Sequence, residues 1–238
     1  MTSQLQDKVA IVTGAGNGLG AASARRLSSE GASVVVVDIA GVAAEQVATS
    51  LPGTATAVQA DVSDERQVDV VLAAALSAYG RIDLHHLNAG IVGSFAPLPE
   101  LSVADFRRVV AVNLDGVFLG LRAAFRQYAI QGGGGAVAIT ASIASLRGSA
   151  DLLPYQASKH GVLGLLHGAA MYGAPRQVRV NAVAPGLVPL ACLRNLPGRR
   201  VVVTTWSPAE QPRPCGESAP QRRWPRWWPS CSVTTPHT

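Results

Sequence analysis

Residues 9–20 read Val-Ala-Ile-Val-Thr-Gly-Ala-Gly-Asn-Gly-Leu-Gly, an apolar, β-branched run that passes directly into four closely spaced glycines. The run is typical of a buried strand, and residues 18–30 have the period of a helix. Glycine suits the junction because the chain turns tightly there and a Cβ would hold the backbone away from a pyrophosphate. A helix N-terminus offers N–H groups and a favourable dipole to phosphates. This stretch predicts a dinucleotide-binding βα unit; the alternative is a glycine turn without a ligand.

The same alternation of strand and helix patterns continues through residue 190. Strands are predicted at residues 9–13, 33–38, 56–60, 82–88, 136–141 and 179–183, and helices at 18–30, 41–50, 64–79, 102–130 and 152–172. The strands are apolar on both faces, so helices must cover both sides of the sheet, with right-handed crossovers between parallel strands. The expected fold is α/β, a doubly wound parallel sheet (Rossmann fold) with six recognisable strands.

Asp38 ends the second predicted strand, 18 residues after Gly20. A carboxylate at this place accepts hydrogen bonds from an adenosine ribose and repels a 2′-phosphate. Neither Asn17 nor Ile39 supplies a positive charge that would favour the phosphate. We therefore expect NAD rather than NADP; the alternative is that Asp38 caps the following helix.

Further polar motifs follow the later strands in a fixed order. Asn88-Ala89-Gly90 follows the fourth strand, Asn113 lies in the long helix, Ser142 follows the fifth strand, and Tyr155-Gln-Ala-Ser-Lys159 opens the last helix. Together with the glycine loop, these motifs resemble the short-chain dehydrogenase/reductase family of the classical type, over about residues 5–190. The resemblance implies an active-site tetrad formed by Asn113, Ser142, Tyr155 and Lys159.

The chemistry of a Tyr–Lys pair supports this tetrad. Residues four apart lie on one face of a helix. A phenol with a pKa near 10 is a poor base at neutral pH, and a nearby ammonium together with the positive nicotinamide ring would lower that pKa. Tyr155 is therefore the expected acid and base, and the alternative is a partly exposed helix pair. In the family, Lys159 also holds the nicotinamide ribose, Ser142 binds the substrate oxygen, and Asn113 anchors a water.

The resemblance also implies the residues that hold the cofactor. They are Gly14, Asn17, Gly18, Leu19, Gly20, Asp38, Asp61, Val62, Asn88, Ala89, Gly90, Tyr155, Lys159, Pro185, Gly186 and Val188. Asp61 is equally well explained as a helix cap. The expected activity is hydride transfer between a nicotinamide cofactor and a secondary alcohol or ketone, in a homodimer or homotetramer. We expect no metal site.

The fourth strand departs from the family pattern. The family usually has a second Asn before the Asn-Ala-Gly triplet, where this chain has Leu87, preceded by His85 and His86. No carboxylate or Cys stands at metal-ligand spacing from these histidines. We interpret them as hydrogen-bonded or exposed histidines at a strand end.

The net charge of +5 does not belong to the region that resembles the family. Residues 1–190 carry 13 basic and 13 acidic side chains, whereas residues 191–238 carry seven arginines and two glutamates. The same segment holds all four tryptophans, all three cysteines and eight of the 15 prolines. Within it, 201–205 alone has the composition of a strand. We therefore divide the chain into a catalytic region, 1–190, and an atypical tail, 191–238.

The tail stands where the family continues into a substrate-covering segment and a seventh strand. Without them, one side of the pocket would be open and the sixth strand would be an exposed edge. The alternative function is thus a folded nucleotide-binding protein with impaired or no catalysis. The tail is either genuine or a shifted reading frame, which translation of the coding DNA in its other frames would decide. We expect no nucleic-acid partner, no membrane association and a cytoplasmic location, since neither a long apolar run nor a signal-type N-terminus is present.

Overall fold

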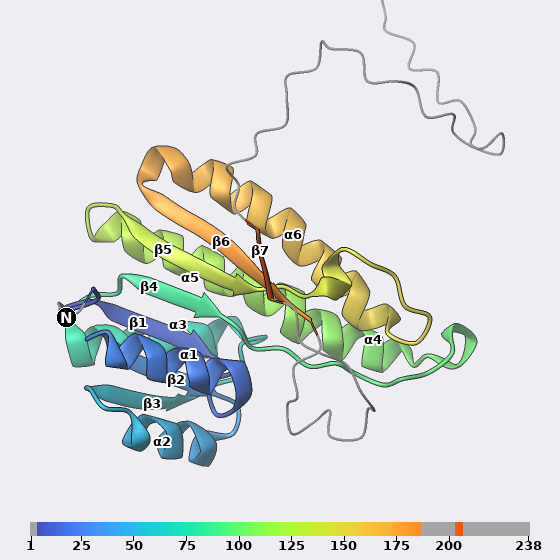
Figure 1. Ribbon diagram of the computed structural model, residues 1–238, viewed down its shortest axis with the longest axis horizontal. Coiled ribbons are helices and arrows are strands. Elements are labelled where there is room, and N and C mark those ends of the chain that lie inside the picture. Colours follow the sequence, from blue (N-terminus) through green and yellow to red (C-terminus); the bar gives the residue numbers. More distant parts are fainter. Residues whose placement is uncertain (1–3, 187–202, 207–238) are drawn as a thin grey trace, which may run out of the picture. The chain divides into compact units, whose positions relative to one another are not determined.

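The computed structural model describes residues 4–186 and the backbone of residues 203–206, and these form a sheet of seven strands with helices on both faces (Figure 1). The strands are β1 Val9–Thr13, β2 Ser33–Asp38, β3 Ala55–Gln59, β4 Leu84–Leu87, β5 Gly135–Thr140, β6 Val178–Pro185 and β7 Val203–Trp206. The α-helices are α1 Gly18–Ser29, α2 Gly41–Ser50, α3 Glu65–Tyr79, α4 Val103–Val110, α5 Gly116–Ile130 and α6 Leu153–Gly173. None of the described helices is long and apolar enough to cross a membrane.

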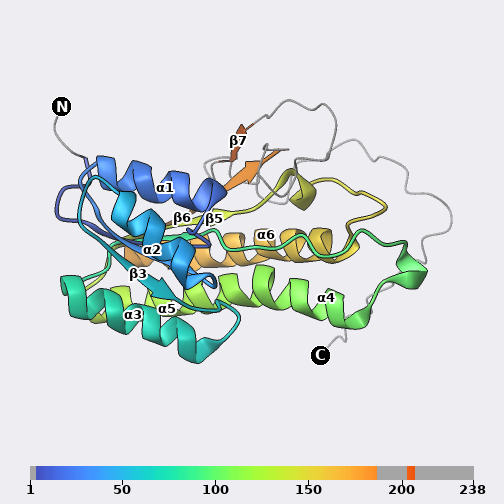
Figure 2. The same ribbon diagram turned by 90° about the horizontal axis from the view of Figure 1, so that it is seen from below.

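The sheet confirms the doubly wound prediction. Its strand order is β3-β2-β1-β4-β5-β6-β7, and the first six strands in the chain are parallel. Helices α1 and α2 lie on one face, and α3, α5 and α6 lie on the other (Figure 2). The chain reverses its direction of winding between β1 and β4. In such sheets, ligands bind outside the carboxyl ends of the strands at this switch point.

An antiparallel strand, β7, lies beside β6. Its register places Val203 opposite Pro185 and Trp206 opposite Ala182. The sequence predicted an exposed β6 edge, and this expectation is wrong for the last four residues of β6. An antiparallel strand can satisfy the edge backbone groups without a helical crossover, so the family's usual ending is not needed for this pairing. The boundary at residue 190 and the rest of the tail lie outside the described residues.

The core consists of apolar side chains that alternate between the two faces of the strands. In β1, Val12 packs with the α1 and α2 side, whereas Ile11 packs with the α3 side. A third cluster joins β4, β5 and β6 to α5 and α6 and includes Ile139 and Leu166. The strands are therefore held from both sides, which gives the polar residues at their carboxyl ends a rigid base.

The predicted helix 102–130 is interrupted at a site residue. A π-helix, Ala111–Asp115, separates α4 from α5, and Asn113 lies in its middle. A π segment inserts one residue into a helical turn and is often found at functional sites. The apolar pattern of a long helix does not show such an insertion, because the residues on both sides remain helical.

Candidate active site

The glycine loop after β1 leaves no room for side chains at two positions. A Cβ at Gly20 would lie 2.1 Å from the carbonyl oxygen of Gly14, and a Cβ at Gly14 would lie 2.7 Å from Cα of Ala89. Gly14 also has a φ of +61°, in the region that favours glycine. At the start of α1, the Asn17 side chain makes no capping hydrogen bond within the described chain. The loop thus forms a backbone cradle at a helix N-terminus, as a pyrophosphate requires.

Asp38 contacts this loop directly. Its Oδ2 accepts a hydrogen bond from the Gly16 N–H at 2.8 Å, and its Oδ1 accepts one from the Ala40 N–H at 2.9 Å. Helix α2 begins at Gly41, with Ala40 as its N-cap residue. Asp38 is therefore not the helix cap; it shapes the turn before α2 and places a carboxylate against the glycine loop.

Asp61 and Val62 follow β3 on the same edge of the sheet. Asp61 Oδ1 accepts hydrogen bonds from the Ser63 N–H at 2.9 Å and from Ser63 Oγ at 2.7 Å. The cap of α3 is Asp64, whose carboxylate accepts from the Arg66 N–H. Asp61 is thus not the cap of α3, and it stabilises the turn that presents Val62.

The Asn88-Ala89-Gly90 triplet fastens the glycine loop to β4. Asn88 Nδ2 donates to the carbonyl oxygens of Thr13 and Gly14, both at 3.1 Å. The N–H groups of Asn88 and Ala89 donate to Thr13 Oγ1 at 3.0 and 3.2 Å. A Cβ at Gly90 would lie 3.6 Å from Lys159 Nζ. The triplet therefore spans the distance from the loop to the tetrad.

Asn113 is fully buried and fixes the backbone after the triplet. Its Oδ1 accepts from the Ile91 N–H and its Nδ2 donates to the Ile91 carbonyl, both at 2.8 Å. Nδ2 also donates to Ser158 Oγ at 3.1 Å. The side chain thus holds the start of the loop 91–98 against α6.

Ser142 and Tyr155 meet through their side chains. The Ser142 Oγ accepts from the Ala144 N–H at 3.1 Å, and a hydrogen bond joins it to the Tyr155 hydroxyl. Burial raises the pKa of Tyr155, and the hydrogen bond with Ser142 acts in the opposite direction. The sequence predicts a lowered pKa for Tyr155 when Lys159 and the positive nicotinamide ring act together; in the protein alone the pKa is raised, because burial penalises the phenolate more than its surroundings stabilise it.

Lys159 brings a cation into the same site. Its side chain is only 3% exposed, and Nζ donates to the Thr140 carbonyl oxygen at 2.6 Å. Nζ lies 5.8 Å from the centroid of the Tyr155 ring. Burial lowers the pKa of Lys159 to about 8. Gly90 lies beside both Asn113 and Lys159. Together with the contacts of Tyr155 with Ser142 and Lys159, this brings the four predicted tetrad residues together at the carboxyl ends of β4 and β5.

The two histidines of β4 lie inside the sheet and not at its end. His85 Nδ1 is 2.8 Å from the Tyr128 hydroxyl, and His86 Nε2 is 3.0 Å from Thr140 Oγ1. Burial lowers the pKa of both from 6.5 to about 4. Leu87, which replaces the family's usual Asn, packs in the apolar cluster of α5 and α6. Residues 4–186 contain no group of three potential metal ligands.

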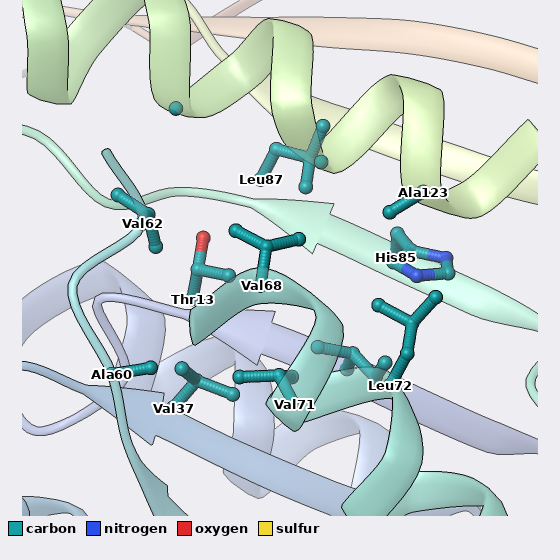
Figure 3. Close-up of a pocket in the computed structure, with 13 residues that line it drawn as sticks. Thr13, Val37, Ala60, Val62, Val68, Val71, Leu72, His85, Leu87 and Ala123 are labelled. Carbon is teal, nitrogen blue, oxygen red and sulfur yellow. The ribbon is translucent and has the colours of Figure 1, made fainter. Parts of the chain in front are cut away.

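A cavity between the sheet and helices α3 and α5 is separate from the tetrad (Figure 3). Its lining includes Thr13, Val62, Val68 and His85 and none of the four tetrad residues. The side chains around it are mostly apolar. The cavity therefore lies between the sheet and these two helices, away from the tetrad, and is not the place where the predicted chemistry would occur.

Two further predicted residues, Pro185 and Gly186, lie at the end of β6. Pro185 is the last residue of that strand, and Gly186 follows it, whereas Val188 lies outside the described residues. Sequence reasoning missed three supporting residues. Thr13 holds the glycine loop to the triplet, Thr140 accepts from Lys159, and Ser158 accepts from Asn113. A signal was present for two of them, since Thr13 and Thr140 are polar residues at the ends of apolar strands.

Comparisons with known proteins agree with this geometry. A family model described as short chain dehydrogenase matches residues 8–197. Levodione reductase of Leifsonia aquatica is 40% identical over 192 residues, which are 79% of this chain and 72% of that protein. A crystal structure of levodione reductase has a TM-score of 0.78 at 38% identity, and the match covers 81% of this chain and 76% of that chain.

Two further similarities point the same way. Cyclohexanol dehydrogenase of Acinetobacter sp. (strain SE19) is 40% identical over 192 residues, which are 79% of this chain and 76% of that protein. The structure of an NAD+-bound xylitol dehydrogenase has a TM-score of 0.74 at 35% identity, covering 77% of this chain and 71% of that chain.

Proposed function

Because this chain belongs to the short-chain dehydrogenase/reductase family of oxidoreductases, we propose that it transfers a hydride between NAD and a secondary alcohol or the corresponding ketone. The observation that carries the proposal is the meeting of Ser142, Tyr155 and Lys159 at the sheet edge that also holds the glycine loop. A hydroxyl, a phenol and an ammonium around one point can bind and protonate one substrate oxygen.

The residues present fit a dinucleotide. Only glycine fits at Gly14 and Gly20, because a Cβ there would collide with the backbone of Ala89 or Gly14, and this close packing lets the loop present its backbone to a pyrophosphate. Asp38 would accept hydrogen bonds from the adenosine ribose, and its charge would repel a 2′-phosphate. NAD is therefore the proposed cofactor, supported by the absence of a basic residue at Asn17 and Ile39.

The protein's own part in the reaction is to move a proton and to orient the substrate. When bound, the nicotinamide would accept the hydride from the carbinol carbon or return it. Tyr155 would take the hydroxyl proton of the alcohol during oxidation and return it to the ketone oxygen during reduction. Ser142 would hydrogen-bond the same oxygen. Lys159 would stabilise the phenolate by its charge and would hold the nicotinamide ribose.

We propose an apolar substrate. The loops 91–98 and 144–153 flank the tetrad, and they expose Phe95, Leu98, Leu146 and Leu153. Exposed apolar side chains on loops beside the tetrad would favour a substrate whose carbon skeleton is apolar. The similarity to cyclohexanol dehydrogenase supports cyclohexanol as the first substrate to test. By family resemblance, we further propose a cytoplasmic homodimer or homotetramer.

The test is a fluorescence titration with NADH and with NADPH, followed by an assay of NADH formation from NAD and cyclohexanol or other secondary alcohols. Tight NADH binding with turnover supports the proposal. Binding without turnover on any alcohol favours the second candidate, a nucleotide-binding protein without catalysis. That candidate is supported by the unmatched quarter of the relatives' length. No binding of either dinucleotide refutes both.

A further inference from the structure

His86 occupies an unusual place for a histidine, in the middle of a parallel sheet. It lies between Val12 of β1 and Ala138 of β5 in the register of the strands. Its neighbour His85 lies on the opposite face of β4, because successive side chains of a strand alternate. The two histidines are adjacent in the strand but lie on opposite faces of the sheet, and only His86 shares a face with Thr140. His85 can therefore serve as a control for His86.

The hydrogen bonds around Thr140 determine which ring nitrogen of His86 carries the proton. The Thr140 hydroxyl donates to Asn88 Oδ1 at 3.0 Å. Its single hydrogen is thereby used, so at the 3.0 Å contact with His86 Nε2 the hydroxyl must accept. Neutral His86 therefore carries its proton on Nε2 and donates to Thr140.

The chain of hydrogen bonds continues from Thr140 to the glycine loop. Asn88 accepts at Oδ1, which orients its amide so that Nδ2 donates to the carbonyl oxygens of Thr13 and Gly14. The Thr13 hydroxyl donates back to the His86 carbonyl oxygen at 3.4 Å. His86 is thus tied to the turn at Gly14 by its side chain and by its backbone.

Thr140 also contacts the tetrad, but through a different atom. Its backbone carbonyl oxygen accepts from Lys159 Nζ, and its side chain does not take part in that bond. A change in the side chain of residue 140 or 86 therefore leaves the acceptor of Lys159 in place. This separates an effect on the loop from an effect on the proton chemistry.

We propose that His86 is a positioning residue of the dinucleotide site, which acts through Thr140 and Asn88 to hold the Gly14 turn in its binding shape. The inference rests on the proposed function. It goes beyond that function because the chain of hydrogen bonds starts at the His86 side chain, which contacts neither the glycine loop nor the tetrad.

The test is NADH titration of the full chain carrying His86→Val. The variant lacks the donor, and the Kd for NADH should rise about fivefold, the factor for a hydrogen bond of about 1 kcal/mol. The KM for NADH should rise in parallel, with kcat at saturating NADH unchanged within about twofold. His86→Gln, which keeps an N–H donor, should bind NADH nearly as the natural chain does.

Two further variants separate positioning from general destabilisation. Thr140→Val should raise the Kd as much as His86→Val, and the double variant should add little, because both interrupt one chain of hydrogen bonds. His85→Leu, adjacent on the other face, should leave the Kd unchanged. Equal Kd values for His86→Val and the natural chain, or an equal rise with His85→Leu, overturn the inference. A natural chain that binds no NADH refutes the proposed function instead.

The tautomer of His86 provides a readout that does not depend on any variant. Nitrogen chemical shifts and ring couplings in an NMR spectrum at pH 7 distinguish Nε2–H from Nδ1–H. We expect Nε2–H for His86. A proton on Nδ1 would remove the donor to Thr140 and would overturn the inference even where His86→Val failed to fold.

Discussion

Replacing His85 by leucine should make the stability of this protein less sensitive to acid. The Tyr128 hydroxyl donates to the Ala136 carbonyl at 3.1 Å, so His85 must donate to it from Nδ1–H. Its Nε2 is buried and has no hydrogen-bond partner among the described residues. Protonation would therefore place a charged N–H among apolar side chains, which explains why burial lowers the pKa of His85 from 6.5 to about 4.

The sign and size follow from the linkage between protonation and folding. Below pH 6.5 the unfolded chain binds a proton at His85 that the folded chain binds only near pH 4. The free energy of unfolding therefore falls as the pH falls through this interval. At about 1.4 kcal/mol per pH unit, lowering the pH from 7.5 to 5 should cost about 2 kcal/mol through His85. His86 contributes in the same direction.

The assay is urea denaturation of the natural chain and His85→Leu at pH 7.5 and pH 5, followed by circular dichroism. The loss of unfolding free energy between the two pH values should be about 2 kcal/mol smaller in the variant. Leu87→Val, two residues along on the same strand face, is the control, because it reduces packing at both pH values without removing a titratable group. Equal losses in His85→Leu and the natural chain would refute the reasoning.

Three predictions concern the active site. Tyr155→Phe should reduce turnover roughly a thousandfold while NADH binding by fluorescence stays unchanged, since the phenol transfers the proton and the ring remains; substantial residual turnover contradicts its role. Asp38→Ala should shift the ratio of the Kd values for NADPH and NADH about tenfold toward NADPH, because the repelling carboxylate is gone; an unchanged ratio refutes the assignment. Alcohol oxidation should accelerate with rising pH and ketone reduction should slow, because oxidation needs the phenolate of Tyr155 and reduction needs the phenol. Initial rates measured across pH in both directions test this, and parallel pH profiles would contradict it.

The pKa of Tyr155 illustrates how the protein and its cofactor divide the chemistry. Burial raises this pKa in the protein, and the nearby ammonium of Lys159 donates its hydrogen bond to Thr140 rather than to the phenol. The protein alone therefore favours the protonated phenol, which is the form that ketone reduction requires. Positive charge on the bound nicotinamide would favour the phenolate for the reverse direction.

The replacement of the family's Asn by Leu87 has a local explanation. The side chain points into the apolar cluster of α5 and α6, where a Cβ at Gly120 would lie 2.5 Å from Leu87 Cδ2. Leucine fills this space without a polar group that would need a partner. Asn88, on the other face, keeps its contacts with the glycine loop, so the departure does not disturb the cradle.

Local patterns were sufficient for the sheet and most helices, and they indicated the tetrad side chains that the structure brings together. Strands and helices can be recognised from residues that are close in the chain, and the need for glycine in the tight turn at Gly14 and Gly20 can be recognised in the same way. The π-helix around Asn113 was missed because its insertion leaves the flanking pattern intact. The pairing of β7 with β6 was missed because it joins segments whose composition does not indicate a partner.

The sequence by itself determined the order of strands and helices, the glycine loop and the residue types of the tetrad, because these follow from short-range periodicity and from motifs within a few residues. The tertiary structure alone decided how the polar groups of different strands pair. Thr140 and His86 are 54 residues apart in the chain and adjacent only because β4 and β5 lie side by side. The tautomers of the two histidines, the raised pKa of Tyr155 and the link from His86 to the Gly14 turn all depend on such contacts and on burial, which no local pattern encodes.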